Sequence, residues 1–102
     1  MFKIETDPGV DKLIWSLEKP TIYKILRTID LLERFGYQLS MPHSKKITDN
    51  LFELRVRGQQ EVRIFYCFHQ GRAHLLSGFV KKSQKTPRTE IDKAINKRGG
   101  LT

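Results

Sequence analysis

Hydrophobic side chains in the first third of the chain recur with the period of an α-helix. Residues 10–17 and 22–35 each carry apolar side chains at spacings of three and four, and Glu18-Lys19-Pro20 breaks the pattern between them. Asp7-Pro8 is typical of a helix N-cap followed by proline in the first turn, and Gly36 is typical of a helix end. The pattern therefore predicts two helices that form a hairpin, with their apolar stripes in the core.

The second half of the chain alternates between apolar and polar residues, which is the period of a β-strand. The alternation is clear in residues 51–57 and 61–69, and residues 73–80 form a more uniformly apolar segment. Short turns at 58–60 and 70–72, each with a glycine, separate these segments. Three consecutive strands with such short connections predict an antiparallel meander.

The remaining segments give weaker signals. Residues 1–5 alternate over a short length and predict a further strand, whereas residues 37–50 lack a sustained period and predict a connection. Thr86-Pro87 repeats the cap-and-proline pair and predicts a short C-terminal helix that ends at Gly99-Gly100. The order β-α-α-β-β-β-α predicts an α+β fold. In it, the helical hairpin packs on one face of a four-stranded, mainly antiparallel sheet and leaves the other face free.

Size and composition agree with one domain. A chain of 102 residues holds one core. The single cysteine, Cys67, cannot form an internal disulfide, and no Cys or His pair has zinc-ligand spacing, which disfavours a secreted scaffold and a zinc module. No apolar segment approaches the ~20 residues of a membrane span. We expect a cytoplasmic domain over residues 1–98 with a short tail, 99–102, without a cofactor, a metal or a membrane contact.

Positive charge is concentrated in the second half. The whole chain has 19 Lys and Arg against 11 Asp and Glu, a net charge of +8. Residues 1–50 hold eight cations against seven acids, whereas residues 51–102 hold eleven against four. The densest run, residues 81–88, has four cations and no acid. Such a field favours a nucleic acid as the partner, with an acidic protein or a merely solvated basic surface as the alternatives.

The first turn of the meander decides which residues face each other. In a regular hairpin Arg57 pairs with Glu61, and Arg63 then stands directly opposite Arg55. Opposed like charges destabilise a sheet by up to ~1 kcal/mol, so their presence indicates a functional site. The alternative is a register shifted by two, or a bulge, in which Arg55 pairs with Glu61. Glu53 would then pair with Arg63, and both would be ordinary ion pairs.

Clustered arginines on strands suit the cleavage of a phosphodiester. The reaction passes through a phosphorane with more negative charge than the ground state, and guanidinium groups grip two phosphate oxygens while staying protonated. RNA provides its own nucleophile, the 2′-hydroxyl, so cleavage requires a base, an acid and charge stabilisation but no metal. We expect Lys81 and Lys82 near the same surface. Phe65, or Tyr66 if twist or a bulge turns it, would stack on a base.

Histidine and cysteine give no catalytic pattern. His43 lies in the predicted connection, His69 at a strand end and His74 within a strand, and no acid is patterned beside them. We interpret them as surface or turn residues, with proton transfer as the alternative. Cys67 and Tyr66 are interpreted as core residues.

Three segments of the second half carry a family resemblance. They are Leu51-Phe52-Glu53-Leu54-Arg55, Arg63-Ile64-Phe65-Tyr66 and Gly78-Phe79-Val80-Lys81-Lys82-Ser83-Gln84-Lys85-Thr86-Pro87. With them, the chain resembles the phage-derived, HigB-like branch of the RelE/ParE toxin superfamily. The resemblance implies a RelE-like fold of the same element order and a toxin of a type II toxin-antitoxin module.

The resemblance also implies an activity and partners. Many members are mRNA interferases, endoribonucleases that cut mRNA on the translating ribosome and so inhibit translation. A helix-turn-helix antitoxin of the HigA type, encoded beside the toxin, neutralises it and represses the operon. Other superfamily members inhibit DNA gyrase without cutting RNA. A ParE-like, gyrase-directed toxin and a nucleic-acid-binding prophage protein are therefore the alternatives.

Site residues follow from the family's motif positions and the basic surface. Arg55, Arg63 and Lys82 are the candidate catalytic residues. Glu53 also falls in the motif, either as a base or as an ion-pair partner that holds Arg55, and the second role is favoured. The candidate RNA-binding residues are Lys45, Lys46, Arg57, Phe65, Lys81, Lys85 and Arg88.

Overall fold

A five-stranded sheet with helices on both faces organises the chain. The computed structural model describes residues 1–101, and Thr102, the end of the predicted tail, lies outside them. The elements in chain order are β1 (Lys3–Thr6), α1 (Pro8–Trp15), α2 (Lys19–Phe35), the 3₁₀ turn η1 (Gly36–Gln38), β2 (Ser44–Thr48), β3 (Leu51–Val56), β4 (Val62–His69), β5 (Arg72–Val80) and α3 (Arg88–Gly99).

The strand order in space is β1-β5-β4-β3-β2. β1 runs parallel to β5, and the other neighbours are antiparallel, so the predicted α+β class and the antiparallel meander of β3, β4 and β5 are confirmed. The predicted four strands are wrong, because β2 forms within the segment predicted to be a connection. An edge strand has one neighbour and does not need a clear hydrophobic alternation. In β2, Lys45 and Lys46 are exposed, whereas Ser44 is buried with its hydroxyl group hydrogen-bonded to that of Tyr66.

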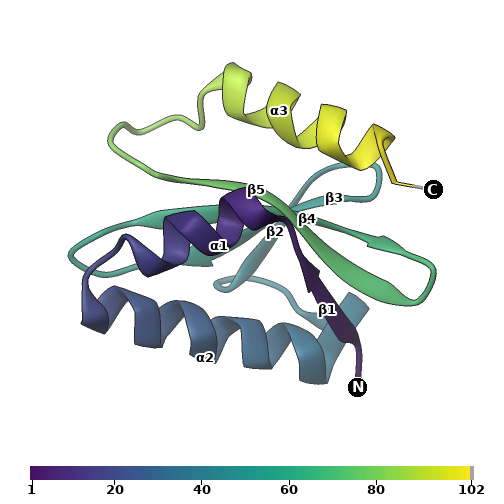
Figure 1. Ribbon diagram of the computed structural model, residues 1–102, viewed down its shortest axis with the longest axis horizontal. Helices are drawn as coiled ribbons and strands as arrows, with labels where there is room; N and C mark the ends of the chain where they lie inside the picture. Colours follow the sequence, from purple (N-terminus) through teal and green to yellow (C-terminus); the bar gives the residue numbers. More distant parts are fainter. Residues whose placement is uncertain (102) are drawn as a thin grey trace.

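The predicted helical hairpin is confirmed on one face of the sheet. α1 and α2 lie together on the side opposite α3 (Figure 1). Asp7 is the N-cap of α1, because its Oδ2 accepts a hydrogen bond of 2.9 Å from the backbone N–H of Gly9. Gly36 ends α2 with a positive φ of 50°, a conformation that glycine adopts without strain. The main core lies between this hairpin and the sheet.

The sequence predicts that the opposite face of the sheet is free. This prediction is wrong, because α3 covers part of that face (Figure 1). The small apolar stripe of α3, Ile91, Ala94 and Ile95, packs against a second group of buried residues. That group consists of Leu51, Phe65, Cys67 and Leu76. A helix with an apolar stripe buries it against another element, and this face is the available surface.

The start of α3 differs from the predicted cap. Pro87 is the N-cap, and no side chain caps the helix. Thr86 instead donates its hydroxyl proton to Oε2 of Glu53 on β3, with an Oγ1 to Oε2 distance of 3.0 Å. The Thr86-Pro87 pair therefore ties the segment before α3 to the sheet. Among the described residues, no helix combines the length and apolarity needed to cross a membrane.

Candidate functional site

The predicted hairpin register is confirmed. Arg55 of β3 lies directly opposite Arg63 of β4, with Val56 opposite Val62 next to the turn. The two arginines therefore stand on the same side of the sheet, which is the side that α3 covers elsewhere. The turn fixes this arrangement, since a slip of one strand by one residue would place the two side chains on opposite faces of the sheet.

One buried carboxylate holds both arginines. Oε1 of Glu53 lies 3.7 Å from Nε of Arg55 and 3.7 Å from Nε of Arg63. Glu53 is only 3% exposed, and its other oxygen accepts the hydrogen bond from Thr86. Of the two roles weighed for Glu53, the structure shows the ion-pair partner. A carboxylate shared in this way offsets the repulsion between two opposed cations.

Arg63 is not free to grip an anion, contrary to the expectation from sequence. Its side chain is 1% exposed, and its Nη2 lies 3.2 Å from Oε2 of Glu61. Its Nη1 donates a hydrogen bond of 3.3 Å to the carbonyl of Val62. Burial and, after it, the neighbouring Arg55 charge lower the pKa of Arg63 below its ordinary value, while Glu53 and Glu61 oppose this. Alternation along the strand predicts which face of the sheet Arg63 occupies, but it does not predict that the side chain is buried there.

A cleft of about 530 Å³ lies above Arg63. Its cationic lining comes from Arg55, Arg57 and Arg63 of the β3–β4 hairpin and from Lys81 and Lys82 after β5. The backbone N–H of Lys81 donates a 2.7 Å hydrogen bond to the carbonyl of Glu61, which holds the lysine pair beside the hairpin. Glu61, Ser83 and Gln84 complete the lining, so the cleft has five cations and one acid, which pairs with Arg63. Within residues 1–101, Arg57, Lys81 and Lys82 have no acidic partner within ion-pair distance.

Five of the residues predicted to bind RNA lie outside this cleft. Lys45 and Lys46 are exposed on the edge strand β2, and Lys85 is exposed on the following loop. Arg88 begins α3, where its Nε lies 3.1 Å from Oδ1 of Asp92. Phe65 is fully buried beneath α3 and stacks on Phe79, with ring centroids 6.0 Å apart, so the predicted exposure of Phe65 is wrong.

The structure adds residues that the sequence did not single out. Thr86 and Glu61 both contact the charged network. Their motif or hairpin positions were visible in the sequence, but their partners depend on the tertiary fold. His43 lines a second groove next to Arg55. Cys67 and Tyr66 are buried, as predicted, and burial raises the pKa of each.

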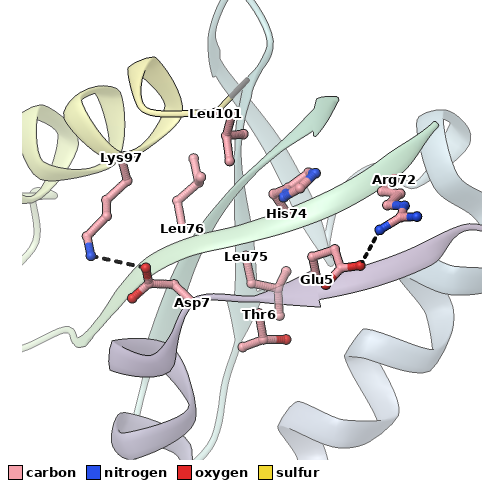
Figure 2. A pocket seen from close by; sticks show the side chains of 9 residues that line it. All are labelled: Glu5, Thr6, Asp7, Arg72, His74, Leu75, Leu76, Lys97 and Leu101. Atoms are coloured by element: carbon pink, nitrogen blue, oxygen red, sulfur yellow. Dashed lines mark hydrogen bonds and ion pairs between the residues drawn. The ribbon is translucent and has the colours of Figure 1, made fainter. Parts of the chain in front are cut away.

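A cavity of about 290 Å³ beneath the end of α3 has different electrostatics (Figure 2). Its acids and bases are paired with one another. Nη1 of Arg72 lies 2.6 Å from Oε1 of Glu5, and Nζ of Lys97 lies 3.0 Å from Oδ1 of Asp7. His74 also lines it, with a buried Nε2 that lacks a hydrogen-bond partner among the described residues. The paired charges leave little net field, so the cleft at Arg55 is the candidate site for an anion.

Cations outnumber acids in the cleft by five to one, because Glu61 is the one acid in its lining. Among residues 1–101, no group of three or more His, Cys, Asp or Glu side chains is arranged to hold a metal ion. A cleft with Arg55, Arg57 and two lysines suits a phosphate, because arginine grips oxygens in pairs and lysine acts as a point charge. The site can therefore bind a phosphodiester and stabilise additional negative charge on it.

An α+β fold with a cationic cleft of this kind is compatible with the RelE-like class of small toxins. Comparison with protein families agrees: the family described as "Phage derived protein Gp49-like (DUF891)" matches residues 12–98. The chain belongs to this phage-derived family, which is a RelE-like toxin family. A search of curated proteins gave no match. Family membership is consistent with a toxin of a toxin-antitoxin module and suggests an antitoxin as its partner.

Proposed function

We propose that the protein is the HigB-like toxin of a type II toxin-antitoxin module and cleaves mRNA on the ribosome. The observation that carries the proposal is the cleft in which Arg57, Lys81 and Lys82 have no acidic partner. Unneutralised cations in a concave site attract a polyanion and bind its phosphates. Membership of a RelE-like toxin family supports RNA on the ribosome as that polyanion.

The reaction uses the nucleophile of the RNA itself. The 2′-hydroxyl gives up its proton to a water molecule as its oxygen forms a bond to phosphorus, and the bond from phosphorus to the 5′-oxygen of the next nucleotide breaks as that oxygen takes a proton from water. The products are a 2′,3′-cyclic phosphate and a 5′-hydroxyl end. Arg55 and Lys82 contact the phosphorane oxygens, where negative charge develops, and Arg63 adds positive charge from the floor of the cleft. Arg57 and Lys81 hold the neighbouring phosphates.

The partners follow from the same charge. The proposed antitoxin is a HigA-like helix-turn-helix protein that offers acidic groups to a chain with a net charge of +8. The ribosome presents the mRNA and thereby orders the substrate. The proposed site of action is the cytoplasm of the host of a prophage.

The test uses a variant of Lys82, which is exposed and outside the hydrophobic core. We expect Lys82→Ala to lower the rate of mRNA cleavage on purified ribosomes by about 10²–10³-fold, because one stabilising charge is lost. The proposed reaction uses no metal ion. Addition of EDTA to the cleavage assay, with ribosomes stabilised by polyamines, should therefore leave the rate of mRNA cleavage by the wild type unchanged. The matched control is Lys93→Ala, an exposed lysine of α3 that pairs with Glu90 and lies outside the cleft.

Mapping of RNA 5′ ends after induced expression gives the deciding result. New ends within translated codons in the wild type, absent with Lys82→Ala and present with Lys93→Ala, support the proposal. Growth arrest without new ends, accompanied by stalled gyrase on DNA, would replace it with the ParE-like alternative. Absence of both arrest and cleavage would leave a nucleic-acid-binding prophage protein.

A further inference from the structure

The cationic cleft lacks a surface for a nucleobase. Its side chains are charged or polar, and they include neither an aromatic ring nor an aliphatic residue. Of the two aromatic residues on this face, Phe65 is fully buried beneath α3, and Phe79 stacks on Phe65 and does not line the cleft. Single-stranded RNA is held by phosphate contacts together with bases that lie against rings or apolar walls. The base next to a bound phosphate therefore needs another surface.

A groove of about 280 Å³ next to the cleft has this surface. It lies between α2 and β3 and shares Arg55 and Arg57 with the cleft. Its apolar walls are Leu31, Pro42 and Val56, and the imidazole of His43 lies among them. Two cations of α2, Lys24 and Arg27, stand at the groove as well.

Hydrogen bonds fix both sides of the groove. The backbone N–H of Arg55 donates a 2.8 Å bond to the carbonyl of His43, so the loop before β2 is held against β3. On the other side, Nζ of Lys24 donates a 3.2 Å bond to the carbonyl of Arg57. The groove is thus a preformed feature of the fold, and its position relative to the shared arginines is set.

We infer that this groove binds one nucleotide of an RNA whose neighbouring phosphate lies in the cationic cleft. The base packs between the imidazole of His43 and the apolar walls, and Arg57, which lines both the cleft and the groove, holds the phosphate that joins them. Arg27 is available for the next phosphate along the chain. The inference rests on the proposed function for the identity of the ligand as RNA, and it adds where a base is recognised. His43 thereby takes a role that strand alternation could not assign.

The experiment measures binding without cleavage. The probes are fluorescent 2′-O-methyl tetranucleotides, which lack the nucleophile, and a matched set with an abasic unit at each position in turn. The full chain is titrated against each probe by fluorescence anisotropy. We expect the abasic unit at one position to weaken wild-type binding by about tenfold, because the base loses its packing surface.

Two variants and a control locate the effect. With His43→Ala the intact probe should bind about tenfold more weakly, and the abasic unit should then cause little further loss. Arg27→Ala, on the exposed side of α2, should weaken all probes by a similar few-fold factor. Arg34→Ala, on the same helix but outside the groove, should leave every affinity unchanged.

The outcomes separate the inference from the proposed function. Equal binding of intact and abasic probes at every position, an undiminished base effect with His43→Ala, or no detectable binding would each overturn the inference. Cleavage of mRNA together with equal abasic binding would overturn the inference alone. A base effect lost with His43→Ala, in a protein that cuts no RNA, would support the groove and contradict the nuclease.

Discussion

The α3-facing side of the sheet has two halves that differ in how they are covered. At one end, Leu51 of β3 with Phe65 and Cys67 of β4 is buried beneath α3. At the other end of the same strands, Arg55 and Arg63 floor a cleft that α3 does not cover. β3 and β4 keep one register through both halves, whereas the register between β4 and β5 shifts between Phe65 and Tyr66. Along β3 and β4, the side chains therefore distinguish the half that packs under α3 from the half that lines the cleft.

In the polar half, some buried arginine nitrogens have an ionic partner but no hydrogen-bond acceptor among the described residues. Glu53 sits at the boundary and pairs with both arginines, yet the Nε atoms of Arg55 and Arg63 are buried without a hydrogen-bond acceptor among residues 1–101. Buried donors without partners each destabilise a fold, and opposed arginines add repulsion. In the apolar half, Ser77 opposite Phe65 and His74 opposite Cys67 also bury a polar atom without a hydrogen-bond partner among residues 1–101, but no two like charges face each other there. The opposed arginines are therefore the feature that distinguishes the polar half, and they agree with the proposed role of Arg55 in binding an anion.

The largest expected effect is in the apolar half. Phe65→Ala removes a fully buried ring that packs on Phe79. We expect the free energy of unfolding to fall by about 4 kcal/mol, since truncating a buried phenylalanine loses transfer free energy and leaves a cavity. Urea denaturation followed by circular dichroism measures the change. A loss below about 1 kcal/mol would show that α3 does not seal this half in solution.

The second effect tests whether the polar half is also structural. Arg63→Ala removes a buried cation and leaves Glu53 with Arg55 as its remaining ionic partner. We expect a loss of about 3 kcal/mol, at the low end for a broken buried pair because Arg55 compensates and the repulsion between arginines disappears.

A double variant checks the cause of that loss. In the Arg63→Ala background, Glu53→Gln removes a buried carboxylate charge that has lost one of its two arginine partners, and it should restore part of the stability, measured by the same denaturation. If Glu53→Gln instead adds a further loss as large as the first, the destabilisation comes from lost packing and the carboxylate is not the cause.

Sequence reasoning succeeds where one local rule decides the outcome. The helix caps at Asp7 and Gly36 depend on neighbouring residues alone, and the Arg55–Arg63 register depends on the hairpin turn. The cationic lining could be predicted as well, because Lys81 and Lys82 directly follow the strand that pairs with β4.

The missed features depend on contacts between distant segments. β2 was missed because its buried position is a serine that hydrogen-bonds Tyr66, so the strand shows no hydrophobic alternation. Phe65 was misplaced because the weak stripe of α3 gives little indication of the face it covers. The ion pairs of Arg63 could have been anticipated, because Glu53 and Glu61 lie near it in the sequence of the hairpin. The burial of its guanidinium group could not, because it depends on the folded cleft.

The smallest expected effect lies at the boundary between the halves, where Thr86 holds Glu53. Thr86→Val keeps the shape and removes the hydroxyl, so we expect a loss of about 1.5–3 kcal/mol for a hydrogen bond to a charged acceptor. Thr86→Ser restores the hydroxyl and should recover most of the stability in the same denaturation series. Because the bond also holds the loop that carries Lys82, Thr86→Val should weaken binding of a 2′-O-methyl oligonucleotide while Thr86→Ser does not. Equal behaviour of valine and serine at this position would mean that Thr86 contributes only packing, and that the two halves of the sheet are not coupled through it.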